Sequence, residues 1–173
     1  GTLPSVNEEG AEKLVQAVEA LWDVGIVVVT AAGNYGPRPG SITSPGISKK
    51  VITVGSCDDQ FYMEEGKKKR KSYSGRGPTA ECVVKPDLLA PGSYITSCNA
   101  RYREKGQKPY TMKSGTSMST PVVSGAIALL LSKYPDMSNV EVKLRLRESS
   151  IDIGRPQNEQ GWGLLNVEKL LKE

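Results

Sequence analysis

Histidine is absent from this chain of 173 residues. Its absence excludes a histidine general base, a histidine metal ligand and a histidine pH switch from the chain itself. A serine paired with a histidine would need that histidine from another polypeptide or from residues outside this sequence. Cysteine is scarce too: three residues without C-x-x-C spacing make neither a zinc site nor a disulfide framework. Free thiols favour a reducing compartment such as a bacterial cytoplasm.

Long hydrophobic runs and a strong charge of one sign are missing as well. No apolar run is long enough for a transmembrane helix, and the net charge of +4 is too small to indicate a nucleic-acid partner. We therefore expect neither a membrane nor a nucleic acid as a partner. Apolar residues make up 38% of the sequence and charged residues 24%, which is typical of a globular chain that buries a core.

Hydrophobic spacing in the first third of the chain predicts an α/β architecture. An S-x-x-E capping box at Ser5 precedes apolar residues at helical spacing, which predicts a helix over 8–22. The β-branched run at 26–30 predicts a strand buried on both faces, and 51–54 predicts a second buried strand. A helix followed by a buried strand is half of a βαβ unit, so we expect a parallel sheet.

The last two thirds of the chain predict more strands and three further helices. We expect short strands over 93–97 and 110–113. The nearly all-apolar stretch from Pro121 predicts a buried central helix that ends near Lys133. The remaining helix signals are a capping box at Ser138, which opens a helix to about Ser149, and a cap at Asn166.

Charged runs in the middle of the sequence have two interpretations each. The basic run 67–71 is either a nucleic-acid patch or a solvated loop insertion, and we favour the loop. The acidic pairs 58–59 and 64–65 could bind a cation, but they lack the spacing of a calcium loop. We therefore expect solvated carboxylates and no metal site.

Ser117 stands at the start of the predicted central helix, within Gly115-Thr116-Ser117-Met118-Ser119. The first N–H groups of a helix and the positive end of its dipole suit a nucleophile whose attack creates an oxyanion. The alternative role is a helix cap or a packing hydroxyl. The G-x-S-x-S spacing argues against an α/β-hydrolase. A Ser/Lys dyad with Lys113 is a second alternative.

Asn34 follows the first predicted strand, in the loop Ala31-Ala32-Gly33-Asn34-Tyr35-Gly36-Pro37. Ligand and catalytic groups of open α/β sheets gather beyond the carboxyl ends of the strands. The Asn34 amide could therefore donate a hydrogen bond to an oxyanion. The alternative is a turn residue, because asparagine near glycine is common in turns.

Taken together, these two segments resemble the catalytic domain of subtilisin-like serine proteases, the subtilases. The segment 115–121, followed by Val123-Ser124-Gly125, is similar to the segment around their nucleophilic serine, and 28–34 is similar to the loop with their oxyanion-hole asparagine. The resemblance implies that Ser117 attacks the scissile carbonyl and that Asn34 and the Ser117 N–H hold the oxyanion. It also implies that Ala31, Ala32 and Gly33 line one wall of the primary specificity pocket.

The resemblance covers the C-terminal portion of that domain and implies a three-layer α/β fold with a mostly parallel sheet flanked by helices. Residues 1–173 would then be the C-terminal part of a single catalytic domain, incomplete without its N-terminal part. In the family the catalytic Asp and His precede the asparagine loop, so we expect them on an upstream segment of the same protein.

The expected function is that of a serine endopeptidase acting on peptide or protein substrates. This chain by itself is expected to lack efficient activity, because it has no histidine. We expect no cofactor; relatives often bind calcium, but no ligand residue can be assigned here. The alternative is a non-catalytic pseudoprotease or peptide-binding module of the same fold.

Overall fold

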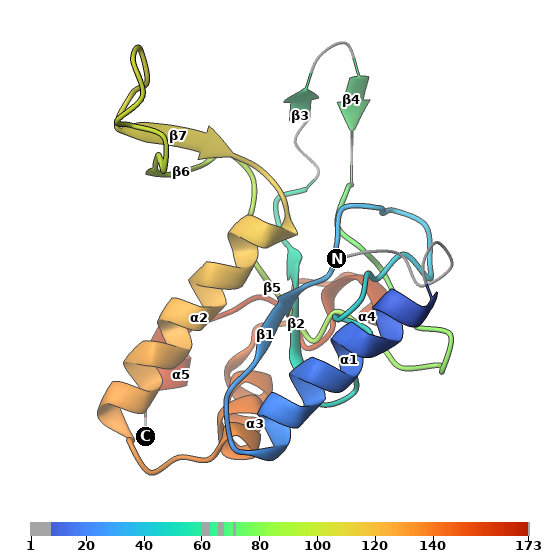
Figure 1. The fold of residues 1–173 in the computed structure, drawn as a ribbon. Coiled ribbons are helices and arrows are strands. Elements are labelled where there is room, and N and C mark those ends of the chain that lie inside the picture. The colour runs from blue at the N-terminus through green and yellow to red at the C-terminus, as the bar shows by residue number, and fades with distance from the viewer. Residues whose placement is uncertain (1–7, 60–62, 66–67, 71, 173) are drawn as a thin grey trace.

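The computed structural model describes residues 8–59, 63–65, 68–70 and 72–172. Its centre is a parallel sheet with the strand order β1-β2-β5. The strands of this sheet are β1 (Val29–Ala31), β2 (Ile52–Ser56) and β5 (Leu88–Ala90). In Figure 1 these strands run between the helices α1 (Glu8–Asp23) and α2 (Thr116–Lys133). The expected α/β class, with a parallel sheet flanked by helices, is confirmed.

The predicted helices all form within a residue or a few of their expected bounds. Beyond α1 and α2 these are α3 (Asn139–Ser149) and α5 (Val167–Leu171), and the structure adds α4 (Gln157–Gln160). The capping box at Ser138 is complete, because its hydroxyl accepts from the Glu141 N–H and the Glu141 carboxylate accepts from the Ser138 N–H. The short α4 was not predicted. Ser5 lies outside the described residues.

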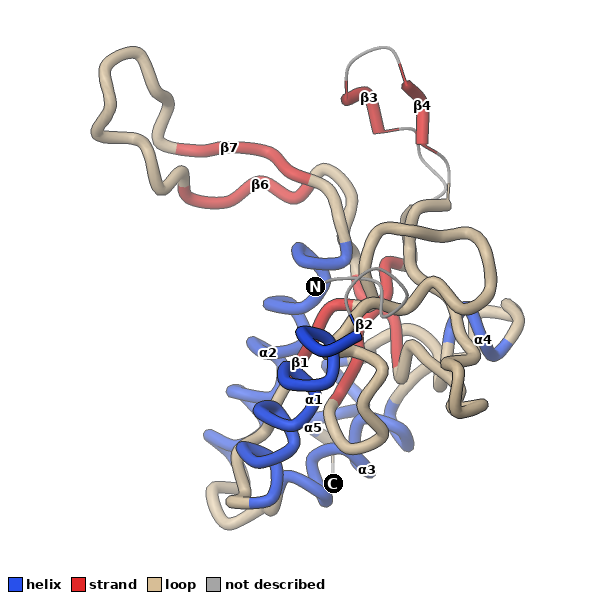
Figure 2. The backbone as a smooth tube through the Cα atoms, turned by 45° about the vertical axis from the view of Figure 1, so that its right-hand side comes forward, coloured by secondary structure: helices blue, strands red, loops and turns tan. Residues whose placement is uncertain are grey.

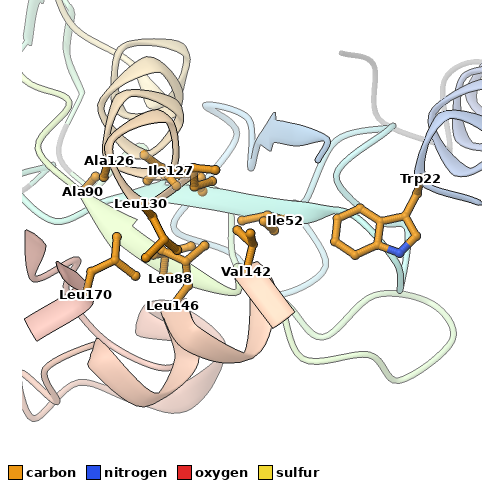
Figure 3. Close-up of a cluster of buried hydrophobic side chains, with 12 residues drawn as sticks. Trp22, Ile52, Leu88, Ala90, Ala126, Ile127, Leu130, Val142, Leu146 and Leu170 are labelled. Carbon is orange, nitrogen blue, oxygen red and sulfur yellow. The ribbon is translucent and has the colours of Figure 1, made fainter. Parts of the chain in front are cut away.

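The core lies where α2, α3 and α5 pack against the sheet. All of β2 is buried, and α2 contacts β1, β2 and β5 (Figure 3). Each large aliphatic side chain buried here contributes about 1.5–3 kcal/mol to folding. The fully buried members of this cluster are Ile52, Val54, Leu88, Ala90, Val123, Leu130, Val142, Leu146 and Leu170. The sheet and the start of α2, which carry the site, are therefore held by one packed cluster.

Two predictions about burial are wrong in part. The strand expected over 26–30 begins at Val29, and β1 lies at the sheet edge, paired with β2 in the described part of the chain. Ile26 is 50% exposed, so this run is not buried on both faces. The helix expected to be buried all round exposes Leu129 by 55%. An apolar run in the sequence indicates that a strand or helix packs against neighbours. It does not show which of its faces those neighbours cover.

Two antiparallel hairpins extend from the end of the molecule at which α2 begins (Figure 2). One joins β6 (Ile95–Cys98) to β7 (Tyr110–Lys113), close to the two strands that the sequence predicts. The other joins β3 (Met63–Glu65) to β4 (Lys68–Arg70), where we expected a solvated loop. Its strands are too short to produce a recognisable alternation of apolar and polar residues. Lys67 and Lys71 of the basic run lie outside the described residues.

The prediction of solvated carboxylates is wrong for Asp58 and Asp59. The Asp58 carboxylate accepts from the N–H groups of Gly92 (2.9 Å) and Ser93 (3.0 Å) and from the Ser56 hydroxyl (2.7 Å). Burial alone would raise the pKa of Asp58, but these donors together lower it. Asp59 is 1% exposed, and burial raises its pKa. Both carboxylates fasten loops to the core.

Neither a membrane helix nor a cation site emerges from the described residues. No helix among them is long and apolar enough to cross a bilayer. No cluster of three or more Cys, Asp or Glu side chains in that part of the chain could hold a metal ion. The three cysteines, Cys57, Cys82 and Cys98, are free thiols.

Candidate active site

Ser117 lies in the first turn of α2, and its side chain is exposed. The residue that caps this helix is Gly115, without a side-chain hydrogen bond, so Ser117 is not the helix cap. Because Ser117 belongs to the first turn, its N–H has no carbonyl partner within the helix. Its hydroxyl and its N–H are thus both placed to meet a molecule outside the helix.

Gly115 adopts a backbone conformation that other residues avoid. Its φ is 146°, and its N–H donates to the Gly92 carbonyl at 2.8 Å. A Cβ atom on Gly115 would lie 3.0 Å from the Asn34 amide nitrogen. Glycine therefore allows the entry to α2 to approach the Asn34 side chain closely.

The Asn34 amide is held by Thr116, 82 residues further along the chain. Asn34 Oδ1 accepts hydrogen bonds from Thr116 N (2.9 Å) and Thr116 Oγ1 (3.1 Å). Thr116 Oγ1 in turn accepts from the Gly33 N–H at 3.1 Å. Because the oxygen of the amide is occupied on the protein side, its nitrogen is left with both hydrogens to donate.

Ser117 and Asn34 face the same cavity, of about 430 Å³. The residues that line this cavity are Ala31, Gly33, Asn34, Tyr35, Thr43, Ser44, Pro45, Thr116 and Ser117. Ala31 and Gly33 thus line the cavity that Ser117 and Asn34 share, and their role in a specificity pocket stays a prediction. Ala32 does not line the cavity: it is fully buried, its N–H donates to Val54 O, and its carbonyl accepts from Thr43 N. Ala32 therefore holds the loop in place.

Sequence reasoning missed several residues of this site. Thr116 was adjacent to the serine but carried no separate signal of its role. Thr43 comes from a loop that crosses the asparagine loop, and a Cβ atom on Gly33 (φ 93°) would lie 2.5 Å from Thr43 Cγ2. This close approach explains the glycine, but only the folded structure shows which residue it accommodates.

Lys113 does not join Ser117 in this cavity. It is exposed on β7 and lines a different cavity, of about 580 Å³, beneath the β6–β7 hairpin. No hydrogen bond links Lys113 to Ser117 in the described part of the chain, so the arrangement gives no support to a Ser/Lys dyad. The site brings an exposed hydroxyl and a side-chain amide to one cavity, and the chain has no histidine to act as a base.

The chemistry of such an arrangement is acyl transfer. An oxygen that develops negative charge next to Ser117 would meet two donors, the Ser117 N–H and Asn34 Nδ2, at the positive end of α2. The donors are in place before any reaction, because the Thr116 hydrogen bonds and the backbone of α2 fix them.

The sequence of this chain is similar to those of known proteases over most of its length. The subtilase family model matches residues 4–163. The chain is 42% identical to serine protease AprX of Bacillus subtilis (strain 168), over 94% of this chain and 39% of that protein. It is 37% identical to subtilisin DY of Bacillus licheniformis, over 92% of this chain and 52% of that protein.

Two solved protease structures are similar to this chain in fold. The prenylagaramide maturation protease PagA matches with a TM-score of 0.66 and 28% identity, over 90% of this chain and 53% of that chain. The self-cleaved protease domain of PatA matches with a TM-score of 0.66 and 27% identity. This chain spans about half or less of the length of these relatives. By sequence and by fold, the chain belongs to the subtilase family.

Proposed function

We propose that this chain supplies the nucleophile and the oxyanion hole of a subtilisin-like serine endopeptidase. The observation that supports this most directly is the meeting of an exposed Ser117 hydroxyl with the Asn34 amide in one cavity. The substrate is a peptide or protein, and the loop around Ala31 and Gly33 contacts the residue on the acyl side of the scissile bond. The proposed chemistry needs no cofactor.

In the proposed reaction, Ser117 Oγ attacks the carbonyl carbon of the scissile peptide bond. A histidine from outside this chain takes the hydroxyl proton and then gives it to the leaving amine as the C–N bond breaks. Between these steps, the carbonyl oxygen carries negative charge and is held by the Ser117 N–H and Asn34 Nδ2. Water then hydrolyses the acyl-enzyme and regenerates the serine.

We propose that the histidine and its aspartate partner come from an upstream segment of the same protein. Residues 1–173 would then form the C-terminal portion of one catalytic domain. The greater length of the relatives supports this proposal. So does the edge position of β1, which has no second neighbouring strand among the described residues and could accept one there.

A groove of about 480 Å³ between β1 and α2 suits such a segment. Its lining is mostly apolar: Gly25, Val27, Val29, Ser124, Ile127, Ala128, Leu131, Pro135 and Met137. Along α2, the exposed residues Ser117, Pro121, Ser124 and Ala128 follow one another on one face of the helix. Their side chains are small, so a second backbone could pack closely along this face and reach Ser117.

The experiment is labelling with a fluorophosphonate probe, read as intact mass. We expect rapid addition of one probe when the protein contains this chain together with the segment that supplies the histidine. The chain by itself should label slowly, because its serine has no base. Ser117→Ala should abolish labelling. Ser132→Ala is the matched control, because Ser132 is an exposed serine of the same helix outside this groove, and it should label like the parent.

Two results would contradict the proposal. If Ser117→Ala labels like the parent, then Ser117 is not the nucleophile. If the protein with its histidine segment binds peptides but never labels, then the chain belongs to a non-catalytic peptide-binding module. Lys113→Met serves as a further check, because it should leave acylation unchanged and would abolish it if the lysine were the base.

A further inference from the structure

The β6–β7 hairpin stands apart from the core and leads directly into the nucleophile. Residues 101–110, at its far end, are all exposed, and β7 is followed within four residues by Ser117 (Figures 1 and 2). A two-stranded hairpin without a packed face gains little stability by itself. The large exposed side chains of this hairpin are therefore better explained by binding than by stabilisation of the fold.

The composition of this hairpin is that of a binding surface. Three of its large apolar or aromatic side chains are more than half exposed: Tyr102 (52%), Tyr110 (65%) and Met112 (60%). The Arg103 guanidinium lies 5.6 Å from the centre of the Tyr102 ring and donates to its hydroxyl. Tyrosine and arginine side chains are enriched where protein surfaces bind partners.

The hairpin also concentrates positive charge. Its five cations face a single carboxylate of the same segment, that of Glu104. Among the described residues none of these cations forms an ion pair. Several other lysines of the chain, in contrast, each pair with a carboxylate. The cations of the hairpin are Arg101, Arg103, Lys105, Lys108 and Lys113.

A cavity of about 580 Å³ opens at the base of the hairpin. Its floor includes Ile95 of β6 and Met118 of α2, and its lining includes the cations Arg101 and Lys113 but no carboxylate. It contacts α2 at Met118, next to Ser117, while the smaller cavity contacts α2 at Thr116 and Ser117. The two cavities therefore adjoin neighbouring residues in the first turn of α2.

We propose that the β6–β7 hairpin and the cavity at its base bind an acidic segment of the polypeptide substrate on the leaving-group side of the scissile bond. This inference rests on the proposed function. If the smaller cavity holds the acyl side, the chain beyond the scissile bond leads over Met118 towards the hairpin. Aspartate or glutamate side chains there would meet cations that form no ion pair in the described structure.

The test compares cleavage of peptides by the protein that combines this chain with its histidine segment. The peptides share one acyl side and carry either Asp and Glu or Lys and Arg after the scissile bond. Two or three exposed ion pairs, at about twofold each, give an expected preference of about four- to eightfold in kcat/KM for the acidic peptide. The preference should fall towards one at about 0.5 M salt.

One variant removes the charge of the hairpin tip, and a matched variant removes as much charge elsewhere. All eight positions are exposed, so neither set disturbs the core. The tip variant is Arg101→Gln, Arg103→Gln, Lys105→Gln and Lys108→Gln. The control variant is Lys13→Gln, Arg147→Gln, Lys169→Gln and Lys172→Gln. We expect the tip variant to lose most of the preference and the control variant to keep it.

A p-nitroanilide substrate separates this inference from the proposed function, because it has no residue after the scissile bond. Parent and tip variant should cleave it equally fast. If the parent fails to cleave it, the proposed function fails. If the parent cleaves it but does not distinguish acidic from basic peptides, the hairpin inference alone is wrong.

Binding gives a readout that does not depend on catalysis. With Ser117→Ala in the same protein, fluorescence anisotropy should show tighter binding of the acidic peptide, and the tip variant should weaken it by the same factor. If the tip charges instead govern binding to a single-stranded oligonucleotide or to anionic vesicles, and peptide binding is unchanged, the partner is not an acidic peptide and the inference is overturned.

Discussion

Replacement of Asn34 by alanine tests whether its side-chain amide donates to the oxyanion. The substitution removes Nδ2, which we propose faces the developing oxyanion, and also Oδ1, which accepts two hydrogen bonds from Thr116. Loss of one oxyanion donor in a subtilisin, a relative of this chain, lowers kcat by about 10²–10³, or about 2.7–4 kcal/mol. We expect a loss of that size here.

The structural part of the effect can be separated with Thr116→Val. This variant removes the hydroxyl that bridges Gly33 N and Asn34 Oδ1 but keeps the backbone hydrogen bond from Thr116 N. It should lower the free energy of unfolding by about 1 kcal/mol, as expected for a lost hydrogen bond. Its kcat should fall less than tenfold, because Asn34 keeps one anchor and its Nδ2.

The assay is steady-state hydrolysis of a p-nitroanilide by the protein with its histidine segment, with urea unfolding measured on each variant. Asn34→Ala should lower kcat and leave KM nearly unchanged, because the donor acts on the transition state and not on the bound substrate. A folded Asn34→Ala variant whose kcat falls less than tenfold would refute the assignment of Asn34. So would equal losses of kcat in Asn34→Ala and Thr116→Val.

Three further predictions concern the residues around the site. Gly115→Ala should cost about 1–3 kcal/mol of unfolding free energy and lower kcat, because its φ of 146° excludes a side chain and Cβ would lie 3.0 Å from Asn34 Nδ2; wild-type stability would contradict this. Asp58→Asn should be less stable than the parent at neutral pH, since the folded state lowers the pKa of Asp58. That difference is complete above the unfolded pKa and should vanish in urea titrations as the pH falls through the folded pKa. Burial lowers the pKa of Lys143 to about 8 from 10.5, so its side chain binds more protons in the unfolded state between these values. This contribution should make stability rise with pH over that window, and the slope should be smaller in Lys143→Met than in the parent.

Most elements of secondary structure were predictable because their signals are local. The capping box at Ser138 and the cap at Asn166 form the hydrogen bonds that their spacing predicts. The strand over 110–113 forms with the expected bounds. Signals of this kind depend on residues a few positions apart, so the sequence contains them whole.

Burial was predicted less well because it depends on what lies opposite. The run from Ile26 looks like a central strand, yet β1 has a neighbour on one side in the described part of the chain. Asp58 and Asp59 look like surface residues, yet they accept hydrogen bonds from backbone groups far along the chain, at Gly92 and Ser74. A carboxylate can be buried only where hydrogen-bond donors surround it in the fold. The sequence next to the carboxylate does not show those donors.

The candidate site likewise combines local signals, which the sequence contains, with long-range contacts, which it does not show. From the residues alone, Ser117 and Asn34 each kept a plain structural alternative, and the resemblance to subtilases brought them together. The structure adds the physical link, because Thr116 bonds the Asn34 amide through both its N–H and its hydroxyl. A pair so far apart in sequence cannot be found by local spacing, while the single residue that joins them stands beside the serine. Thr116 thus orients the asparagine and, by starting α2, leaves the Ser117 N–H without a helical partner. Both oxyanion donors that we propose therefore depend on one short segment of backbone.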